Sequence, residues 1–375
     1  MILNPRSLRV IIFSLILLVS LTAGLLFFSN GDSDLSTGDS VAGKPDKFVA
    51  TDNTLIRISD KMVEPVSDPA VNLLFFGDLM LDRHIGEKLS GRHLDYLLGD
   101  LASSTPEFFV GYDLIGANLE GAVTRGGIHY PPVMSYDFAF TPERVEELKK
   151  YGFNFFNIAN NHITDQGGRG LTETREELTK LGLDYSGTSD ATIDENSIRI
   201  IERSGQKIAL IGLSMVYHDF DLLTAAALIK EAQKNADLVI INIHWGTEYQ
   251  HQFNKQQQTI GRALVAAGAD IIVGHHPHVV QGLEIYQGKP IFYSLGNFIF
   301  DQYFSPDTQQ GLAVGLKLTD DKISITLFPL QAQAAIINLM VGSAKDNFLL
   351  KYADWSTGDE DFRAIIKSQL IEIKR

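Results

Sequence analysis

The sequence predicts an α/β domain that follows one N-terminal membrane-spanning helix. From residue 71 onward, short apolar runs alternate with amphipathic stretches, which is the pattern of strands alternating with helices. Several of these runs end in Asp, Asn, Glu or His, as strands of open α/β sheets do at a ligand site. The 375 residues, 45% of them hydrophobic, are enough for one large domain or two small ones.

The membrane helix is predicted from residues 10–28, an uninterrupted apolar run long enough to span the hydrocarbon core of a bilayer. Arg6 and Arg9 precede it, whereas residues 31–40 hold three Asp and no Lys or Arg. Under the positive-inside rule, residues 1–9 lie in the cytoplasm and the body of the protein lies outside it. A cleaved signal peptide is the alternative, but the long run and the lack of a clear cleavage site favour a single-pass anchor in the cell membrane.

Residues 29–70 are predicted to be a flexible tether, because they are rich in Ser, Gly, Asp and Pro. The domain itself is predicted at residues 71–330. Its expected strands are 71–76, 113–118, 153–159, 208–213, 238–244 and 271–273, and its expected helices are 142–151, 171–181, 222–235 and 255–267. The first helix has Thr141 as its N-cap and Pro142 at its first helical position.

Beyond residue 274 the pattern changes to hairpin-like strands separated by Gly or Asp turns, at 283–286, 290–293, 312–318 and 323–328. Residues 331–375 have a weak helical pattern and no motif that we can assign, so they are predicted to be a C-terminal extension. No internal repeat at solenoid or propeller spacing is present.

Composition excludes several classes of function. With 46 acidic and 32 basic residues the formal net charge is -14, which disfavours nonspecific binding to nucleic acid or anionic lipid. The absence of cysteine excludes disulfides, thiolate zinc sites and a thiol nucleophile. Any metal ligands must therefore be imidazole, carboxylate or amide groups.

Polar side chains follow five of the predicted strands. They are Asp78 and Arg83 after the first, Asn118 and Glu120 after the second, Asn160, Asn161, His162 and Asp165 after the third, His244 and Glu248 after the fourth, and His275, His276 and His278 after the fifth. Each motif alone has an ordinary explanation as a turn or a helix cap. Five strand ends that deliver these residue types together indicate a metal centre, since such ends converge on one crevice. His276 and His278 suit one ion, because alternate residues of an extended segment point to the same side.

These motifs resemble the bacterial capsule-synthesis CapA family, which is associated with poly-γ-glutamate capsules and is itself similar to calcineurin-like metallophosphoesterases. The matching segments are G-D-L-M-L-D-R at 77–83, N-L-E at 118–120, A-N-N-H-I-T-D at 159–165, H-W-G-T-E-Y at 244–249, G-H-H-P-H-V-V-Q-G at 274–282 and Y-S-L-G-N-F-I-F-D-Q at 293–302. Together they span residues 72–302. The resemblance implies a four-layer αββα sandwich, in which helices cover the outer faces of two central sheets.

The resemblance also implies roles for individual residues. The implied metal ligands are Asp78, Glu120, Asn161, His244, His276 and His278. His162 is the implied catalytic proton donor, and we expect Asp165 either to orient it or to cap the following helix. Substrate contacts are assigned to Arg83, Asn118, Asn160, His275, Glu248 and Asn297. Arg83 suits a carboxylate or phosphate because guanidinium binds either in a bidentate way.

One position departs from the phosphoesterase pattern. Met80 stands two residues after Asp78, where those enzymes usually carry a histidine ligand. The centre is therefore expected to hold a single divalent ion, or two if Asp82 or His275 substitutes for the missing ligand. Ligand types alone do not distinguish manganese, zinc, iron, magnesium and calcium.

Three functions remain open at this point. The first is a metal-dependent hydrolase or transferase that acts on poly-γ-glutamate or a related envelope polymer, at an amide or phosphoester bond. The second is a non-catalytic subunit that binds the polymer or membrane partners during capsule synthesis or export. The third is a secreted metallophosphoesterase, which the missing histidine disfavours.

Overall fold

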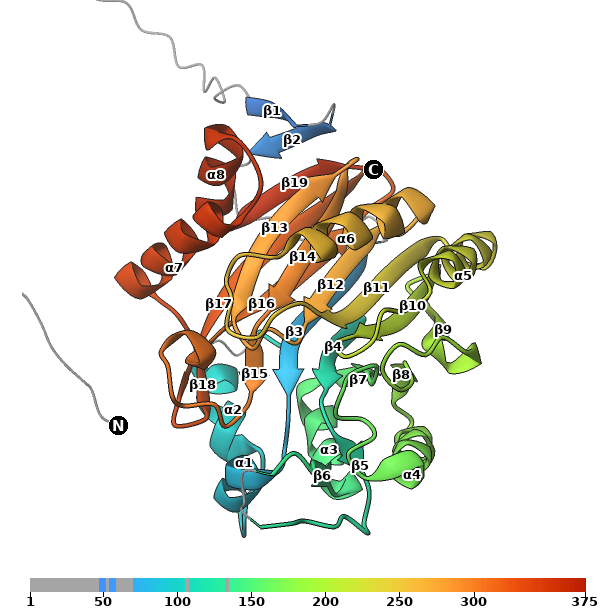
Figure 1. Cartoon of the computed structure of the whole chain (residues 1–375). Helices are drawn as coiled ribbons and strands as arrows, with labels where there is room; N and C mark the ends of the chain where they lie inside the picture. The colour runs from blue at the N-terminus through green and yellow to red at the C-terminus, as the bar shows by residue number, and fades with distance from the viewer. Residues whose placement is uncertain (1–46, 52–53, 59–69, 105–107, 132–134) are drawn as a thin grey trace, which may run out of the picture. The chain divides into compact units, whose positions relative to one another are not determined.

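The computed structural model describes residues 47–51, 54–58, 70–104, 108–131 and 135–375 (Figure 1). The predicted anchor at 10–28 lies outside the described residues. Among the helices that are described, none combines the length and apolar character needed to cross a membrane. Residues 47–51 and 54–58, which the sequence assigned to the tether, instead form a hairpin of two strands, and the second of these pairs with the last strand of the chain.

The larger sheet runs in the order β1-β2-β19-β17-β16-β3-β4-β7-β8, with β15 paired to β3 and β18 to β17. Its strands are β1 (Lys47–Thr51), β2 (Thr54–Ile58), β3 (Val71–Leu79), β4 (Leu114–Leu119), β7 (Phe153–Asn157), β8 (Asp184–Ser186), β15 (Asn297–Ile299), β16 (Gln310–Leu318), β17 (Lys322–Gln333), β18 (Ile336–Leu339) and β19 (Leu370–Lys374). Strands β3, β4, β7 and β8 are parallel, so their carboxyl ends meet at one edge of the sheet.

The smaller sheet has the order β13-β14-β12-β11-β10-β9. Its strands are β9 (Ile198–Arg203), β10 (Gln206–Met215), β11 (Leu238–Trp245), β12 (Ile271–His275), β13 (Val280–Tyr286) and β14 (Lys289–Leu295). Strands β10, β11, β12 and β14 are parallel, and the antiparallel β9 and β13 form the two edges. A separate pair, β5 (Ala122–Val123) and β6 (Ala139–Phe140), lies in the loops that follow β4.

The two large sheets pack face to face around a shared apolar core, in which Phe75 and Leu316 of the larger sheet join Leu210 and Val273 of the smaller one. Helices α5 (Leu222–Asn235) and α6 (Lys255–Ala267) cover the outer face of the smaller sheet. The outer face of the larger sheet is covered by α1 (Arg83–Lys88), α2 (Asp95–Ser104), α3 (Pro142–Glu147) and α4 (Gly167–Lys180). The layers are therefore helices, sheet, sheet and helices (Figure 1), and the predicted α/β class is confirmed.

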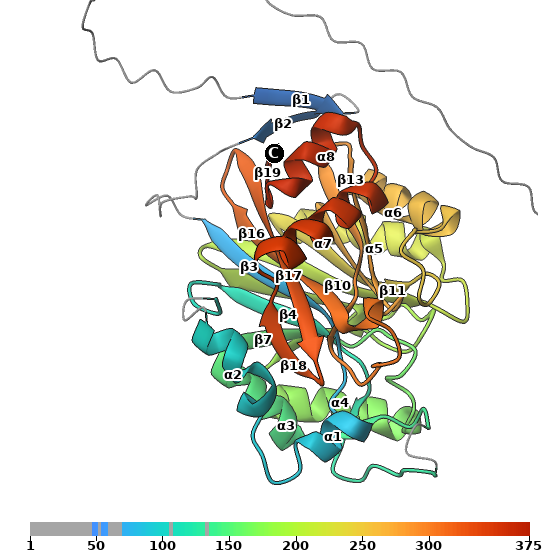
Figure 2. The ribbon, with the colours of Figure 1, turned by 90° about the vertical axis from the view of Figure 1, so that its left-hand side faces the viewer.

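The C-terminal residues are part of this same architecture. Helices α7 (Gly342–Trp355) and α8 (Glu360–Lys367) bury Phe348, Tyr352 and Phe362 in the core between the sheets. Figure 2 shows both helices lying over the side of the sheets that carries β13 and β17. The chain then ends in β19, which pairs with β17. The stretch 331–375, set apart by its sequence as an extension, thus completes the larger sheet.

The predicted elements agree closely with the structure where the pattern was strong. Helices α5 and α6 have the predicted bounds. The predicted helix 142–151 is divided into α3 and a 3-10 turn, η1 (Leu148–Tyr151), and the Thr141 side chain makes no capping hydrogen bond. The further 3-10 turns, η2 (Glu195–Ser197) and η3 (Asp307–Gln309), were not predicted. Neither were α1 and β8, since elements of three to six residues are too short to show a period.

Candidate metal centre

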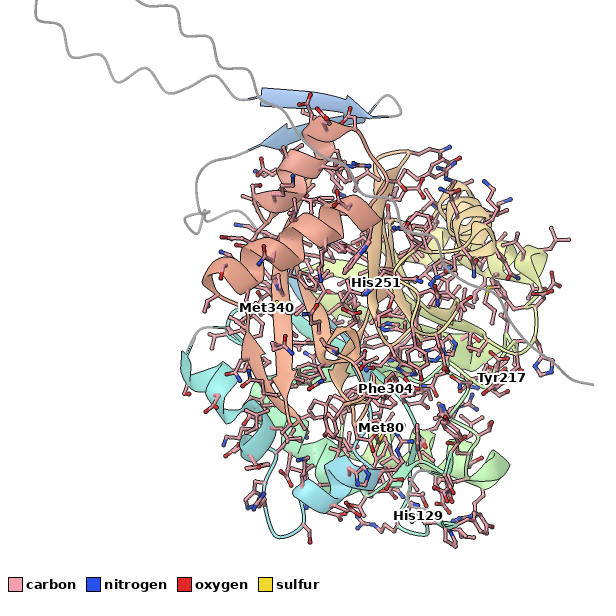
Figure 3. All side chains as sticks on the ribbon, turned by 60° about the vertical axis from the view of Figure 1, so that its left-hand side comes forward. Met80, His129, Tyr217, His251, Phe304 and Met340 are labelled. Carbon is pink, nitrogen blue, oxygen red and sulfur yellow. The ribbon has the colours of Figure 1, made fainter. Side chains whose placement is uncertain are left out.

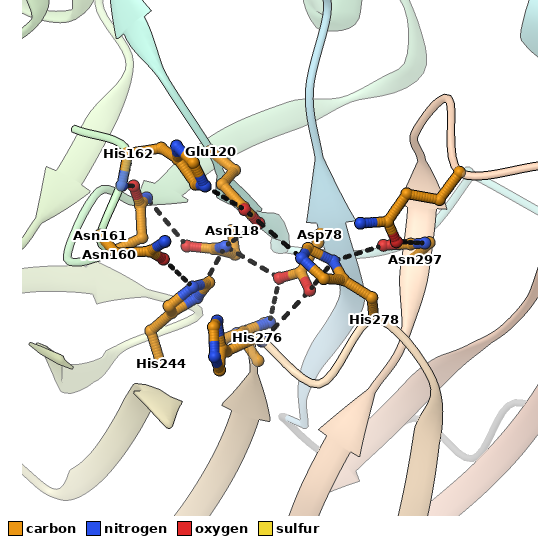
Figure 4. A network of polar contacts seen from close by, with 12 residues as sticks. Asp78, Asn118, Glu120, Asn160, Asn161, His162, His244, His276, His278 and Asn297 are labelled. Carbon is orange, nitrogen blue, oxygen red and sulfur yellow. Dashed lines mark hydrogen bonds and ion pairs between the residues drawn. The ribbon is translucent and has the colours of Figure 1, made fainter. Parts of the chain in front are cut away.

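The candidate site lies where the carboxyl ends of the parallel strands of both sheets meet (Figure 4). Asp78 belongs to β3 and Asn118 to β4, while His244 and His275 lie at the ends of β11 and β12. Two glycines allow the close approach. A Cβ atom on Gly77 would lie 1.8 Å from the Gly296 carbonyl oxygen, and one on Gly274 would lie 2.0 Å from that of Tyr293. Each glycine directly precedes a site residue, so the backbone spacing that positions the site depends on both.

Asp78 is fully buried at the middle of this network (Figure 4). Its carboxylate accepts hydrogen bonds from the Asn118 side chain at 2.8 Å and from the backbone N–H of His276 at 3.1 Å. The Nδ1 atoms of His275 and His278 lie 3.6 and 3.5 Å from its two oxygens. Asp78 is thus surrounded by imidazole and amide groups, with no Lys or Arg in an ion pair with it among the described residues.

Glu120 supplies the second buried carboxylate. Its Oε1 atom has no hydrogen-bond partner within the described part of the chain, yet two imidazole nitrogens face it. These are Nε2 of His162 at 3.7 Å and Nε2 of His278 at 3.9 Å. Ligand atoms that each lie about 2 Å from one ion are separated by roughly 3 to 4 Å. The spacing and the unpartnered oxygen therefore fit a cation held between these groups.

Two overlapping groups of side chains have the ligand-atom spacing of a metal site. Asp78, Glu120 and His278 form one, and Glu248, His276 and His278 form the other, with the ligand atoms of each group within 4.8 Å of one another. His276 Nδ1 is also buried without a hydrogen bond to any described residue. The structure therefore brings together four of the six ligands that the sequence predicted, and it adds Glu248 to them.

Hydrogen bonds orient two of the imidazoles toward Glu120. His278 Nδ1 lies 3.0 Å from the side-chain oxygen of Asn297, and His162 Nδ1 lies 2.8 Å from Asp165 Oδ2. Because these acceptors take the Nδ1 proton, the Nε2 lone pair of each ring faces the centre. Asn297 is held in turn by its donation to the Thr308 carbonyl at 3.0 Å. Asn297 and Asp165 thus determine which nitrogen of each neighbouring histidine is available.

The remaining two predicted ligands are paired with each other. His244 Nε2 lies 2.8 Å from Asn161 Oδ1, and His244 Nδ1 lies 3.2 Å from the Asn118 amide nitrogen. The His244 ring is 4.8 Å from that of His276. An ion bound by His244 and Asn161 together would take the place of the proton that lies between them.

Burial governs the protonation of the site. It raises the pKa of Asp78 to about 7, although hydrogen bonds from Asn118 and His276 act against this shift. The pKa of Glu120 is raised well above its usual value by burial and then by the nearby charge of Asp78. Burial also lowers the pKa values of four imidazoles of the site, which are His244, His275 (to about 3), His276 (to about 4) and His278. These four imidazoles are therefore neutral near pH 7, as ligands must be, while ionised carboxylates lack a compensating charge.

The backbone around the histidines differs from the prediction. His276 and His278 do not alternate along an extended strand, because β12 ends at His275 and both residues have positive φ, 97° and 58°. Such conformations cost about 1 to 3 kcal/mol each in residues other than glycine. The tight turn, rather than strand alternation, brings the two rings to a centroid distance of 5.9 Å.

The predicted substrate contacts fall into two groups. Asn118, Asn160 and His275 are fully buried, and Asn297 supports His278 from behind. Arg83 is also buried, where it forms an ion pair with Asp301, and its guanidinium lies 4.6 Å from the Phe138 ring centre. In contrast, Glu248 is exposed to solvent. Glu248 is therefore the one member of the predicted set that faces solvent beside the centre.

The residue at the position that departs from the phosphoesterase pattern has its side chain in an apolar cluster. Met80 is buried in the core beneath the helices of the larger sheet, and its sulfur accepts a hydrogen bond from the Asp82 backbone at 3.0 Å. Asp82 joins His129 and Asp137 in a separate group. Asp82 and His275 were the two residues suggested as substitutes for the missing histidine ligand. Of these, His275 lies beside Asp78, and its Nδ1 atom has no hydrogen-bond partner among the described residues.

Two supporting residues were missed by the sequence analysis. Asn157, the last residue of β7, donates to the Asn118 side-chain oxygen at 2.9 Å, and Asp301 binds Arg83. The strand-end rule that selected Asn118 applies equally to Asn157, and Asp301 lies within the Y-S-L-G-N-F-I-F-D-Q segment. Asn157 falls inside the strand that was predicted at 153–159, and Asp301 follows β15, which was not predicted, so the rule reaches these residues only with the strand bounds of the structure.

Comparison with known families gives a match over most of the described domain. The family model described as "Bacterial capsule synthesis protein PGA_cap" matches residues 72–302. This is the stretch that carries the motifs, so the predicted resemblance is confirmed.

Curated relatives agree with this match. The chain is 32% identical over 283 residues to "Capsule biosynthesis protein CapA" of Bacillus anthracis, covering 70% of this chain and 68% of that protein. It is 34% identical over 254 residues to "PGA biosynthesis protein CapA" of Bacillus subtilis, covering 64% of this chain and 66% of that protein. Among solved structures, a hypothetical protein from Thermus thermophilus matches with a TM-score of 0.45 at 14% identity, covering 69% of this chain and 99% of that one.

Proposed function

The chain belongs to the bacterial capsule synthesis protein family, and from this we propose that it is a metal-dependent hydrolase or transferase in the synthesis or export of a capsule polymer. Poly-γ-glutamate or a related envelope polymer is the proposed substrate, because the similar Bacillus subtilis protein is described as a PGA biosynthesis protein. The bond that reacts is an amide or a phosphoester.

One observation carries the proposal of a metal. The Oε1 atom of Glu120 is completely buried and lacks a hydrogen bond to any described residue, while imidazole nitrogens of His162 and His278 face it at 3.7 and 3.9 Å. A buried carboxylate oxygen without a partner is costly, and a divalent ion offsets that cost. Asp78, Glu120 and His278 would hold the ion, with His276 and Glu248 beside them. A second ion would need His244 and Asn161 to separate.

The chemistry divides between the ion and the chain. When bound, a divalent ion supplies a Lewis acid that polarises a carbonyl or phosphoryl oxygen and lowers the pKa of bound water. As an imidazolium, His162 keeps one proton at Nδ1, where Asp165 Oδ2 holds it at 2.8 Å and fixes the ring orientation, and donates its second proton from Nε2 to the leaving group. Asn297 holds His278 and Asn118 holds Asp78, so that neither ligand must reorganise.

The fold and the sequence of the N-terminal segment support two finer proposals. The order of layers and the positions of Asp78, the Asn161–His162 pair, His244 and the His276–His278 turn support a calcineurin-like metallophosphoesterase fold. The apolar run at 10–28 and its flanking charges support a single-pass membrane anchor with the domain outside the cytoplasm. Such an anchor would hold the site where an exported polymer emerges.

A turnover assay on the full-length chain tests the proposal. Purified protein is given manganese or zinc and incubated with a γ-glutamyl polymer and, separately, with a generic phosphodiester, while its metal content is measured. We expect bound metal and cleavage of one substrate in the wild type, and loss of both in Glu120→Gln. Glu146→Gln, which changes a glutamate on the outer side of α3, serves as the matched control. Absence of metal from the wild type under all conditions would overturn the proposal.

A non-catalytic role in polymer binding or capsule assembly is the second candidate. Met80 favours this role. The position two residues after Asp78 lacks the histidine ligand that is usual in phosphoesterases, and the Met80 side chain is buried in the apolar cluster between the larger sheet and its outer helices. This role predicts bound metal without cleavage of either substrate, together with loss of capsule in cells that carry His276→Ala. The turnover assay and the capsule measurement therefore separate the two candidates.

A further inference from the structure

Tyr217 lies at the surface of the protein, beside the candidate metal centre (Figure 3). The residue is 70% exposed, yet its hydroxyl accepts a hydrogen bond from the Asn161 amide nitrogen at 3.3 Å. Asn161 Oδ1 in turn lies 2.8 Å from His244 Nε2, near the end of β11. The Tyr217 hydroxyl is therefore connected to an imidazole of the site through a single amide.

One carboxylate fixes the segment that carries Tyr217. Asp190 lies in the loop that follows β8 of the larger sheet, whereas Tyr217 follows β10 of the smaller one. The two oxygens of Asp190 accept hydrogen bonds from four donors of one short segment, which are the Ser214 hydroxyl (2.5 Å) and the backbone N–H groups of Val216 (2.8 Å), Tyr217 (3.1 Å) and His218 (3.2 Å). Three consecutive N–H groups converge on one side chain only while the backbone is folded around it, so Asp190 sets the backbone from which Tyr217 projects.

Asp190 is suited to this task because its carboxyl stays ionised. Its side chain is only 11% exposed, and burial acts to raise the pKa of the carboxyl. Hydrogen bonds from Ser214, Val216 and Tyr217 together outweigh burial and hold that pKa below its usual value. An ionised carboxylate is a strong acceptor, so this contact between loops of the two sheets persists at neutral pH.

The Tyr217 hydroxyl has a proton to donate. A phenolic hydroxyl carries one proton and can also accept, and here the Asn161 amide occupies the accepting side of the oxygen. No acceptor for the proton is seen among the residues that the structure describes. A hydroxyl that accepts one hydrogen bond becomes a better donor for the next, because the bonds polarise one another. The group is therefore a neutral donor that is available to a ligand at the edge of the metal centre.

A poly-γ-glutamate chain offers an acceptor next to each of its amide bonds. Every unit carries a free α-carboxylate on the carbon that is bonded to the amide nitrogen. A carboxylate therefore lies beside each amide whose carbonyl a bound metal ion could polarise. Hydrogen bonds to an ionised oxygen are about twice as strong as those between neutral groups. A tyrosine hydroxyl can thus select for this carboxylate without a charge of its own.

We propose that Tyr217 contacts the substrate, with its hydroxyl donating to an α-carboxylate of the γ-glutamyl chain, and that Asp190 is the positioning residue that holds this hydroxyl at Asn161. The inference deepens the proposed function by naming a specificity-determining contact of the same site, and it rests on that function for the polymer being the ligand. The contact operates in binding and requires no turnover.

Calorimetry on the full-length chain in the presence of manganese tests the contact with two probes. One is a hexamer of γ-glutamate, and the other is the same hexamer with its carboxylates converted to methyl esters. The wild type should bind the ester more weakly than the acidic hexamer, because the ester offers no ionised oxygen.

Tyr217→Phe keeps the ring and removes only the hydroxyl. It should weaken binding of the acidic hexamer about tenfold and binding of the ester about twofold or less. Tyr96→Phe makes the same change at an exposed tyrosine of α2, on the outer face of the larger sheet, and should leave both affinities unchanged. An unchanged affinity in Tyr217→Phe, an equal loss for the two probes, or no binding of the acidic hexamer by the wild type would overturn the proposal.

Asp190→Asn tests the positioning role through a double-mutant cycle. It should weaken binding of the acidic hexamer about tenfold in the wild type, but only about twofold or less in a protein that already carries Tyr217→Phe. Asp354→Asn, on the exposed surface of α7, is the matched control. Urea unfolding measures the stability of each variant separately. Equal losses of affinity in the two backgrounds would show that Asp190 acts independently of Tyr217 and would overturn its positioning role.

Turnover of the same hexamer separates this inference from the proposed function. In Tyr217→Phe we expect KM to rise with the loss of affinity while kcat changes little. Absence of turnover, with binding that still depends on the Tyr217 hydroxyl, would count against the enzyme alone. Turnover by the wild type, with binding that is indifferent to the hydroxyl, would count against this inference alone.

Discussion

Asp165 Oδ2 lies 2.8 Å from Nδ1 of His162 and also accepts the backbone N–H of Phe138 at 3.0 Å. The His162 ring is stacked on the Phe138 ring with a centroid distance of 4.3 Å. One carboxylate therefore fixes both the imidazole and the segment against which the imidazole packs. This leaves the Nε2 atom facing Glu120, on the inner side of the site.

Asp165→Asn should lower the kcat of metal-dependent turnover by roughly 10- to 100-fold with little change in KM, because partners of this kind set the orientation of the group they hold. His162→Ala should lower kcat at least as far. Steady-state kinetics with matched metal loading provide the measurement. Asp354→Asn, on the exposed surface of α7, is the control. An unchanged kcat in Asp165→Asn would show that the aspartate only supports the Phe138 segment.

Glu120→Gln should have opposite effects with and without metal. In the metal-free protein the change removes a buried carboxylate whose Oε1 lacks a partner among the described residues, so we expect the free energy of unfolding to rise by about 1 to 3 kcal/mol. The stabilisation that added manganese or zinc gives the wild type should be lost. Thermal unfolding with and without metal measures both effects. Equal stabilisation of the variant and the wild type by metal would rule out Glu120 as a ligand.

Metal binding should release protons in a way that depends on Asp78. The pKa of Asp78 in the folded protein is raised to about 7 from 3.8. The protonated carboxyl therefore stabilises the metal-free fold at low pH, and this stabilisation is lost as the pH rises through about 7. An ion requires the ionised form, whereas His275 and His276 are already neutral at pH 6, because burial lowers their pKa values to about 3 and about 4.

Calorimetry in two buffers of different ionisation enthalpy measures this release. The number of protons released should be larger at about pH 6 than at about pH 8.5, and metal affinity should rise with pH across that interval. Asp78→Asn should remove the difference if the variant still binds metal. The same proton release at both pH values would show that Asp78 does not ligate the ion.

Arg83→Ala should destabilise the protein by about 3 to 5 kcal/mol, because it leaves Asp301 buried without its counter-charge. Asp301→Ala should destabilise by a comparable amount, and the double variant should be much less destabilised than the sum. Urea unfolding of the four proteins forms the double-mutant cycle. A change in KM without loss of stability would instead support the substrate contact first predicted for Arg83.

Met80→His should not restore a metal ligand. The Met80 side chain is completely buried in an apolar cluster, where the Asp82 backbone N–H is the one hydrogen-bond donor recorded on it among the described residues, so the second nitrogen of an imidazole would lack a partner. We expect a loss of about 1 to 3 kcal/mol in unfolding free energy and an unchanged number of bound ions. Metal analysis and urea unfolding measure the two quantities. An additional bound ion in the variant would mean that the side chain can turn toward Asp78.

Strong periodicity made much of the fold predictable. The bounds of α5 and α6 follow from amphipathic runs with clear ends, and the capping box formed by Asn254 and Gln257 marks the start of α6. In contrast, β19 has only five residues and pairs with β17, which ends some forty residues earlier in the chain. Pairing over that separation leaves no local pattern, so the C-terminal residues were predicted to be an extension.

The candidate site could be predicted as a set of residues but only partly as an arrangement. Strand ends identified Asp78, Glu120 and His278, because parallel strands of a sheet deliver their last residues to the same edge. The turn that joins His276 to His278 was predicted to be extended, since positive φ in residues other than glycine has no sequence signature. The burial of Arg83 was also missed, because its partner Asp301 lies 218 positions away in the sequence.

The amino-acid sequence by itself determined the family, the α/β class and the identity of the residues that end the parallel strands, because each depends on local order along the chain. Only the tertiary structure decided which of those residues meet around Glu120. It also decided that Met80 is buried in the apolar cluster beneath the outer helices of the larger sheet and that Arg83 pairs with Asp301. It also placed Tyr136 and Tyr249, which lie on separate loops, against His162 and His278. The physical reason is that burial and ligand spacing depend on how the two sheets pack against each other, and that packing joins residues with no periodic relation in sequence.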